Sequence, residues 1–160
     1  MTDGAHLRLM VTRGVKRTVN QDPRFAIGKA TVVIVAEHKV PRPEGKARGL
    51  TLFTSAFRTS GPDVFDLRLN SHSRLNLIQA LLQAIQAGAD EALMLDPRGF
   101  VASCNSTNFF IVRGGELWTS TGHYNFCGIT QANVIAAWRA AGGTALDRAA
   151  PVPATTLGPS

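Results

Sequence analysis

The sequence has few cysteines and no long apolar run. Cys104 and Cys127 are the two cysteines among 160 residues, and neither has metal-site spacing to the other or to a histidine. We therefore expect two free thiols rather than a disulfide framework or a zinc module. No apolar run approaches the ~20 residues of a membrane span, and Asp3, His6 and Arg8 interrupt the start, so neither a membrane span nor a signal peptide is predicted. A cytoplasmic protein is the expectation.

Charged residues are also few, and lysine is much scarcer than arginine. Charged side chains make up 18% of the chain, hydrophobic ones 44%, which is typical of a globular domain. The formal charge of +6 comes from basic residues that are scattered, without a tight run interleaved with aromatics, so no nucleic-acid partner is expected. The lysines are Lys16, Lys29, Lys39 and Lys46, all in the first third of the chain.

Three strands are expected in the first part of the chain. His6–Thr12 alternates apolar and polar residues, and Leu50–Phe57 has a similar composition. Ala30–Ala36 is a continuous β-branched run, which predicts a buried strand. Lys39–Arg48 contains prolines, glycine and charges, and is expected to be a loop.

The second part should contain helices and short strands. Helical spacing of apolar residues predicts a helix over Arg74–Ala87, with Ser73 as N-cap and Gly88 as the residue after its end. A second helix is expected over Thr130–Ala141. Gly114 and Gly115 join two apolar runs and predict a hairpin. The expected strands are Glu91–Leu95, Phe100–Ala102, Asn108–Val112 and Glu116–Thr119.

The order of these elements favours a mixed α/β (α+β) domain, and three segments carry a resemblance. They are HLRLMVTRG, GADEALMLDPRGFVASCNSTNFFIVRGGELWTS and GITQANVI. Taken together and in this order, they resemble the class IV aminotransferases, which use pyridoxal phosphate. That family includes branched-chain and D-amino-acid aminotransferases and aminodeoxychorismate lyase.

The resemblance implies the large C-terminal domain of the fold-type IV pyridoxal-phosphate enzymes (D-amino-acid aminotransferase-like), truncated at both ends. Residues 1–141 would form a partial class IV domain and residues 142–160 an irregular tail. It also implies amino acid and 2-oxo acid substrates, and a homodimer in full-length members.

The family lysine that bonds covalently to the cofactor aldehyde has no counterpart here. Its position falls on Ser73 or Arg74, and Arg74 is favoured. An arginine stays protonated, so it neither forms this bond nor accepts a proton. Arg74 could bind an anion instead, or be a solvated residue of the first helical turn.

Other site residues are implied by the same resemblance. Ser103 stands where the family has the carboxylate that pairs with the pyridine nitrogen, and Arg8 matches an arginine near the substrate carboxylate. The phosphate would be held by the turn Gly128-Ile129-Thr130 at a helix N-terminus, beside Ser106 and Thr107. Simpler roles stay open: a polar strand residue for Ser103, an N-cap for Thr130 and an outward edge residue for Arg8.

Three functions follow as alternatives. The first is transamination between a branched-chain amino acid and a 2-oxo acid, impaired by the missing lysine. The second is aminodeoxychorismate lyase-like chemistry on the same fold. The third is a catalytically inactive fragment that only binds a partner or dimerises.

Overall fold

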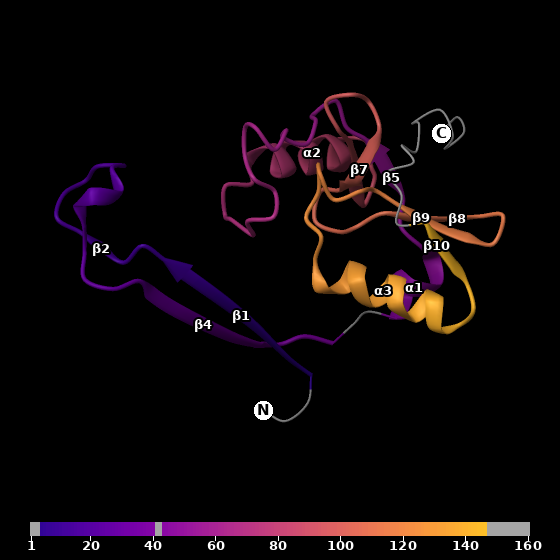
Figure 1. Ribbon diagram of the computed structural model, residues 1–160, viewed down its shortest axis with the longest axis horizontal. Helices are drawn as coiled ribbons and strands as arrows, with labels where there is room; N and C mark the ends of the chain where they lie inside the picture. The colour runs from indigo at the N-terminus through magenta and orange to yellow at the C-terminus, as the bar shows by residue number, and fades with distance from the viewer. Residues whose placement is uncertain (1–3, 41–42, 147–160) are drawn as a thin grey trace. The chain divides into compact units, whose positions relative to one another are not determined.

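The computed structural model describes residues 4–40 and 43–146. The chain forms two compact units, Met1–Arg48 and Gly49–Ser160, each with its own contacts (Figure 1). Both contain strands and helices, so the expected mixed α/β class is confirmed. No helix among the described residues is long and apolar enough to cross a bilayer.

The described residues of the first unit form one long and one short antiparallel strand pair. Strand β1 (Ala5–Thr12) pairs with β4 (Thr31–His38), and Ala5 lies opposite His38. The remaining elements are β2 (Val15–Lys16), η1 (Pro23–Phe25), β3 (Ala26–Ile27) and α1 (Pro43–Arg48). Helix α1 corrects the expectation of a loop over Lys39–Arg48, because Pro43 fits the first turn of a helix despite its reputation as a breaker.

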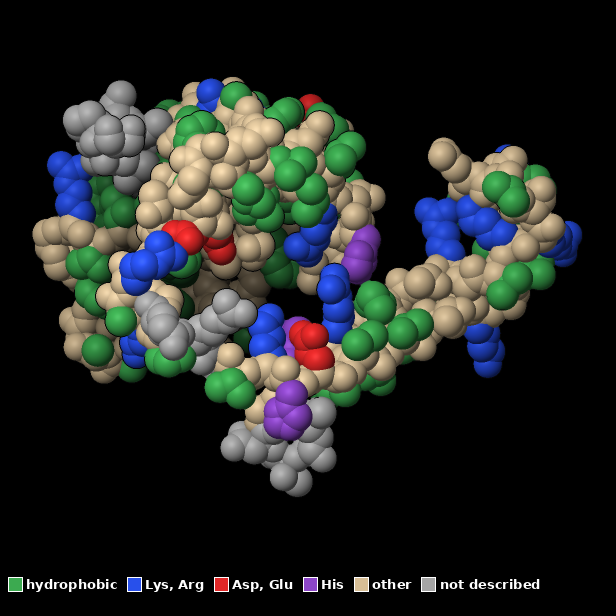
Figure 2. All heavy atoms as spheres, turned by 180° about the vertical axis from the view of Figure 1, so that it is seen from behind, with side chains coloured by type: hydrophobic (Ala, Val, Ile, Leu, Met, Phe, Trp, Pro, Cys, Tyr) green, Lys and Arg blue, Asp and Glu red, His purple; other side chains and the backbone are tan. Residues whose placement is uncertain are grey.

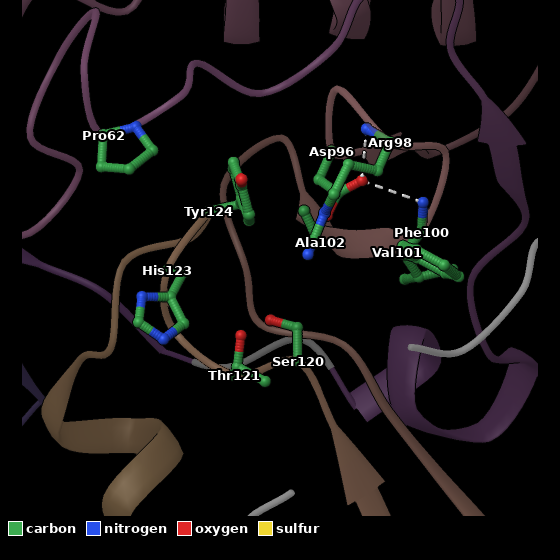
Figure 3. A pocket seen from close by; sticks show the side chains of 10 residues that line it. All are labelled: Pro62, Asp96, Arg98, Phe100, Val101, Ala102, Ser120, Thr121, His123 and Tyr124. Atoms are coloured by element: carbon green, nitrogen blue, oxygen red, sulfur yellow. Dashed lines mark hydrogen bonds and ion pairs between the residues drawn. The ribbon is translucent and has the colours of Figure 1, made fainter. Parts of the chain in front are cut away.

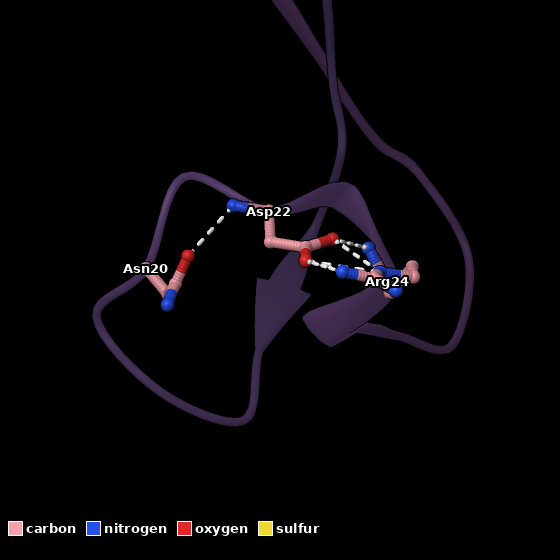
Figure 4. Close-up of polar contacts among 3 residues, drawn as sticks. All are labelled: Asn20, Asp22 and Arg24. Atoms are coloured by element: carbon pink, nitrogen blue, oxygen red, sulfur yellow. Dashed lines mark hydrogen bonds and ion pairs between the residues drawn. The ribbon is translucent and has the colours of Figure 1, made fainter.

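Polar contacts shape the tip of this strand pair (Figure 4). The Asn20 side-chain oxygen accepts a hydrogen bond from the Asp22 backbone N–H at 2.8 Å. The Asp22 carboxylate accepts from the backbone N–H and the Nε of Arg24 at 2.9 and 3.0 Å, which caps η1. The hydrogen bonds from the Arg24 side chain lower the pKa of Asp22. This is a local, exposed arrangement that fixes the turn.

The strand pair β1–β4 is exposed on both of its faces. Leu9 and Ile34 lie opposite each other and are each 64% exposed. Figure 2 shows hydrophobic side chains along the surface of this pair. The strand over Ala30–Ala36 therefore exists, but the expectation that it is buried is wrong for this unit. A two-stranded ribbon needs a second layer to bury either face, and this unit supplies none among its described residues.

The second unit contains two three-stranded sheets. In the first, β5 (Leu52–Thr54) is parallel to β6 (Glu91–Leu95), which is antiparallel to β7 (Val101–Cys104). In the second, β9 (Glu116–Thr119) lies between β8 (Phe110–Arg113) and β10 (Thr144–Leu146). Strand β10 corrects the expected irregular tail where it is described; residues 147–160 lie outside the described part.

The core of this unit lies on both faces of β6. Ala92 and Met94 face helix α2 (Leu75–Gln86) and pack against its Ala80 and Ala84. Leu93 and Leu95, on the opposite face, pack against Val101 and Cys104. Successive residues of a strand point to opposite faces, so the apolar run of β6 is buried on both sides. The small alanines of α2 allow the helix to approach the sheet closely.

Glycines are found at the end of helix α2 and in the β8–β9 hairpin, whereas the expected serine does not cap the start of α2. Helix α2 begins after Arg74, which is its N-cap and makes no side-chain capping bond, so the Ser73 cap is wrong. Gly88 follows the C-cap with φ +76°, as expected for this end. Gly114 and Gly115 have φ of +59° and +79° and join β8 to β9, which confirms the hairpin.

Candidate active site

The second long helix, α3 (Ile129–Ala140), starts at the predicted phosphate-binding turn. Gly128 is its N-cap, and no side chain caps the first turn. The backbone N–H groups of Ile129, Thr130 and Gln131 make no hydrogen bond with the described residues, as is usual for the first turn of a helix. Unpaired N–H groups and the helix dipole both favour an anion here. A dianionic phosphate therefore fits this helix start.

Gly128 has a packing reason to be glycine. An added Cβ would lie 3.0 Å from the Phe126 ring, closer than ordinary contact. Its backbone is extended, with φ −83° and ψ 171°, so the requirement comes from space and not from strain. Ile129, the next residue, is exposed. A side chain at Gly128 would therefore displace the Phe126 ring next to the first turn of α3.

A partly buried hydrogen-bond network holds this helix start against the β8–β9 hairpin. The Asn108 side-chain amide donates to the Phe126 carbonyl at 2.9 Å and to Gln131 Oε1 at 3.4 Å. Gln131, 5% exposed, donates in turn to Thr119 Oγ1 at 3.4 Å. The Thr119 hydroxyl donates to the Phe109 carbonyl at 2.8 Å. Four segments are thus joined around the first turn of α3.

Ser106 and Thr107 lie in the turn before Asn108, and both contact a carboxylate. Thr107 Oγ1 donates to Glu91 Oε2 at 2.7 Å, and Ser106 Oγ lies 3.5 Å from Glu91 Oε1. In the same turn, Asn105 Oδ1 accepts from the Ala92 N–H at 2.8 Å. The two hydroxyl groups are therefore engaged with Glu91, and their predicted role toward a cofactor stays a prediction.

Ser103 and Cys104 end the buried strand β7. Ser103 is 9% exposed and lies opposite Met94 in the sheet. Burial raises the pKa of the Cys104 thiol from its ordinary 9.0 to about 11, so this thiol stays protonated and unreactive near neutral pH. A buried hydroxyl at Ser103 can exchange hydrogen bonds with a ring nitrogen, but it carries no charge to offer it.

Arg74 is exposed, and the hydrogen bonds of its side chain with described residues are to its own loop. Its Nε donates to the Ser71 carbonyl at 2.8 Å, and its Nη2 donates to the Asn70 side-chain oxygen. Among the described residues, no hydrogen bond or ion pair joins Arg74 to Ser103 or to the start of α3. Arg8 lies in β1, in the other unit, and is exposed there. Within the second unit, the structure thus brings together the turn at Asn108 and the start of α3, and no hydrogen bond between described residues joins Arg74 to that network.

No amine in the second unit could bond to a cofactor aldehyde. The sequence has no lysine anywhere between Gly49 and Ser160. Pyridoxal phosphate needs a site for its phosphate and an amine for its aldehyde. The start of α3 in this unit suits the phosphate, but the unit has no lysine for the aldehyde. Nor do the described residues group three or more His, Cys, Asp or Glu side chains as a metal site.

Sequence reasoning missed several residues that shape this unit. Gln131 and Thr119 act through bonds to distant segments, and such bonds leave no local pattern. The ion pair of Asp96 with Arg98, at 2.7 Å, spans only two residues of a Gly-containing turn and could have been anticipated.

Comparison with known proteins explains the arrangement. The family model described as "Amino-transferase class IV" matches residues 2–156. The chain belongs to the class IV aminotransferase family. A relative from Arabidopsis thaliana, "Branched-chain-amino-acid aminotransferase-like protein 2", is 36% identical over 135 residues, which cover 84% of this chain and 24% of that protein.

Solved structures of this family share the fold. A branched-chain aminotransferase from Thermoproteus uzoniensis with norvaline matches with a TM-score of 0.84 and 26% identity, over 96% of this chain and 50% of that one. An aminotransferase from Brucella abortus bound to the cofactor PLP, which is pyridoxal phosphate, matches with a TM-score of 0.78 and 26% identity, over 96% and 53%. The fold-type IV expectation is therefore confirmed. The chain spans about half the length of these structures.

Proposed function

We propose that this polypeptide is a branched-chain-aminotransferase-like protein that binds pyridoxal 5'-phosphate and whose transamination is impaired. Its substrates would be an amino acid and a 2-oxo acid, as for the family. The observation that carries the proposal is the lysine-free unit Gly49–Ser160, which nevertheless keeps the family's sheet and helix start. Binding through the phosphate and loss of the covalent bond are separable, because different residues are responsible for each.

The start of α3 supports the binding half of this proposal. The first-turn N–H groups and the exposed Thr130 hydroxyl would hold the phosphate. The Asn108–Gln131–Thr119 network would keep this turn in place against the hairpin. Ser106 and Thr107 would keep their neighbouring turn in shape through Glu91. When bound, pyridoxal phosphate supplies an electron sink for the carbon that loses a proton.

The chemistry of Arg74 and Ser103 supports the impaired half. A guanidinium is a cation without a free lone pair to accept a proton, so Arg74 would leave the family's proton transfer without its base. A serine hydroxyl at Ser103 can hydrogen-bond the ring nitrogen but does not stabilise its protonated form as a carboxylate does. Arg8 remains a candidate for the substrate carboxylate only.

The test adds lysines back. The 160-residue chain is incubated with pyridoxal phosphate, reduced with borohydride, digested and examined by mass spectrometry. We expect no specific adduct on the unmodified chain, although phosphate-competable fluorescence of the bound cofactor should be seen. Variants Ser73→Lys, Arg74→Lys and Asn70→Lys test the position, since the Arg74 side chain contacts Asn70. One of them should gain a phosphate-competable adduct.

The matched control is Arg113→Lys, which places a lysine on strand β8, outside this loop. It should label no more than the unmodified chain does. A specific adduct on Lys16, Lys29, Lys39 or Lys46 of the unmodified chain would contradict the impaired half. No phosphate-competable binding in any variant would contradict the binding half.

An alternative is a catalytically inactive module that dimerises. It is favoured by an apolar stripe on the outer face of α2, which consists of the exposed residues Leu75, Ile78, Leu82 and Ile85. Homodimers or larger assemblies in light scattering, without cofactor binding, would favour this alternative. No observation favours lyase chemistry over transamination.

A further inference from the structure

Charged groups are arranged differently in the two units. The second unit has a pocket of about 210 Å³ whose lining includes Asp96, Arg98 and Tyr124 (Figure 3). Arg98 donates from Nε and Nη2 to the Asp96 carboxylate at 3.0 and 2.7 Å, and its guanidinium lies 4.7 Å from the centre of the Tyr124 ring. The charges of this pocket therefore pair with each other. The first unit instead presents an uncovered apolar face next to a cluster of basic side chains.

One face of the strand pair β1–β4 is apolar along its length. Residues directly opposite each other in an antiparallel pair share a face, and Leu9 lies opposite Ile34. The register places the following residues on this apolar face: Leu7, Leu9, Val11, Val32, Ile34 and Ala36. Its leucines, valines and isoleucine are 58% to 65% exposed. A contiguous apolar surface of this kind marks a contact with another molecule or with a membrane.

Basic side chains gather at one end of this face, in the segment that joins β1 to β4. They are Arg13, Lys16, Arg17, Arg24 and Lys29, and Figure 2 shows lysine and arginine side chains at this end of the strand pair. The one acid of the segment, Asp22, is paired with Arg24. No ion pair joins the other four to a carboxylate of the described residues. Val19, in the same segment, is fully exposed.

The excess positive charge of the chain belongs entirely to this unit. Met1–Arg48 contains ten lysines and arginines and four aspartates and glutamates, whereas Gly49–Ser160 contains seven of each kind. The formal charge of +6 is therefore that of the first unit alone. Two copies that met through their apolar faces would bring two such units together, and repulsion between like charges opposes this. Charge complementarity favours a negatively charged partner.

An anionic lipid surface supplies both features that the first unit needs in a partner. The boundary between headgroups and acyl chains takes up apolar side chains to a depth of ~5–10 Å, and the unpaired strand edges can stay in the hydrated headgroup layer. Anionic headgroups attract lysine and arginine. A nucleic acid would neutralise the basic cluster but would leave the apolar face in water. The combination of the two features therefore favours lipid.

We propose that the first unit docks on an anionic lipid surface. The apolar face, with Leu9 and Ile34 at its centre, lies in the boundary between headgroups and acyl chains, and Arg13, Arg17 and Lys29 contact the headgroups. This docking uses neither pyridoxal phosphate nor any residue of the second unit, so it stands or falls separately from the proposed function. It places the polypeptide on a membrane surface without a spanning segment.

The test is co-flotation of the full chain with vesicles of phosphatidylcholine, alone or with about one third phosphatidylserine. We expect binding to the anionic vesicles that is at least about tenfold tighter than to the neutral ones, since the basic cluster contributes only there. Raising the salt from ~0.1 to ~0.5 M should weaken this binding by about tenfold through screening. Equal binding to the two kinds of vesicle would overturn the proposal.

The apolar face is tested by the double variant Leu9→Thr/Ile34→Thr. Threonine keeps the β propensity of these positions but lowers their apolar area, so binding to anionic vesicles should fall by about tenfold. The matched control is Met10→Thr/Val33→Thr, another directly opposite pair of the same strands that lies on the other face. It should change binding by less than about twofold, because those side chains stay in water.

The basic cluster is tested by Arg13→Gln/Arg17→Gln, which lies outside β1 and β4. Binding should fall by about fivefold for each charge removed. Arg68→Gln/Arg113→Gln removes the same charge from the second unit and should bind as the unmodified chain does.

Circular dichroism establishes that each variant is folded. Unchanged binding in a folded Leu9→Thr/Ile34→Thr chain, or an equal loss in its control, would overturn the proposal. If that variant does not fold, unchanged binding in Arg13→Gln/Arg17→Gln decides against it in the same way. So would self-association in light scattering without vesicle binding, or a DNA duplex that is bound more tightly than the vesicles.

Discussion

The strand pair β1–β4 and the strand pair β6–β7 have similar apolar, β-rich sequences and opposite environments. Leu9 in β1 is 64% exposed, whereas Leu93 in β6 is 3% exposed. The difference comes from what covers them: α2 packs on one face of β6, and Phe109, Ile111 and Trp118 pack against the cluster on the other. The first pair has no such layer among the described residues of its unit. The comparison teaches that an apolar strand indicates a surface that will be covered, and does not identify the element that covers it.

The largest expected effect is the difference in stability loss between alanine variants of Leu93 and of Leu9. Leu93→Ala should lower the free energy of unfolding by about 2–5 kcal/mol, because it leaves a cavity in the core. Leu9→Ala should change it by less than about 0.5 kcal/mol, as for most exposed positions. Urea unfolding followed by far-ultraviolet circular dichroism measures this, because the strands of both units contribute to the signal. Equal losses in the two variants would show that β1–β4 is also covered in solution.

Polar contacts should also contribute more to the free energy of unfolding in the second unit than in the first. Gln131→Ala leaves the side chains of Asn108 and Thr119 with lost partners, and should cost about 1–3 kcal/mol of unfolding free energy. Glu37→Gln disrupts the exposed contact of Glu37 with His6, at 2.9 Å, and should cost less than about 1 kcal/mol. Thermal unfolding by calorimetry distinguishes these values. A larger effect for Glu37→Gln would contradict the view that contacts of the first unit are weak.

Two glycines of the first unit sharpen the comparison further. Gly14 and Gly28 have φ of +79° and +77°, so alanine at either position should cost about 1–2 kcal/mol locally. A Cβ at Gly14 would also lie 2.3 Å from the Lys29 carbonyl oxygen, whereas a Cβ at Gly28 meets nothing within 4 Å. Hydrogen exchange of the β1–β4 amides should therefore be accelerated more by Gly14→Ala. Equal rates would indicate that the strand pair is not held in this conformation.

The smallest expected effect concerns the thiols and pH. Burial raises the pKa of Cys104 from 9.0 to about 11, so the folded state favours the neutral thiol more than the unfolded state does. This contribution to stability is complete below pH 9 and is lost as the pH rises from 9 toward 11. The variant Cys104→Ser should lack that decline in urea midpoints. Near pH ~8, a thiol reagent should modify the exposed Cys127 and leave Cys104 unmodified until the chain unfolds.

Much of the local structure could be predicted from sequence, because its causes are local. Alternation predicted β1, the β-branched run predicted β4, and the paired glycines at 114–115 predicted the β8–β9 hairpin. The end of α2 at Gly88 followed from its φ preference. The start of the same helix was not predicted correctly, because Ser73 is a favourable capping residue but the helix begins one residue later, after Arg74.

The candidate site, too, was predicted only in its local part. The turn Gly128-Ile129-Thr130 was predicted from its order in the chain, and the structure places it at the start of α3. The partners that hold this turn are 12 and 23 residues from Gln131, and no local pattern announces them. The pocket at Arg98 brings together residues from three separate segments, so it too could not be predicted from spacing.

Sequence alone determined that the unit Gly49–Ser160 lacks an amine for a cofactor aldehyde, because a missing residue type is missing in every conformation. Sequence order also indicated the family. Only the tertiary structure decided which apolar strands are buried, which side chains hold the start of α3, and which residues line the pocket at Arg98. Burial and hydrogen bonding depend on contacts between distant segments, and the chain must fold before those contacts exist.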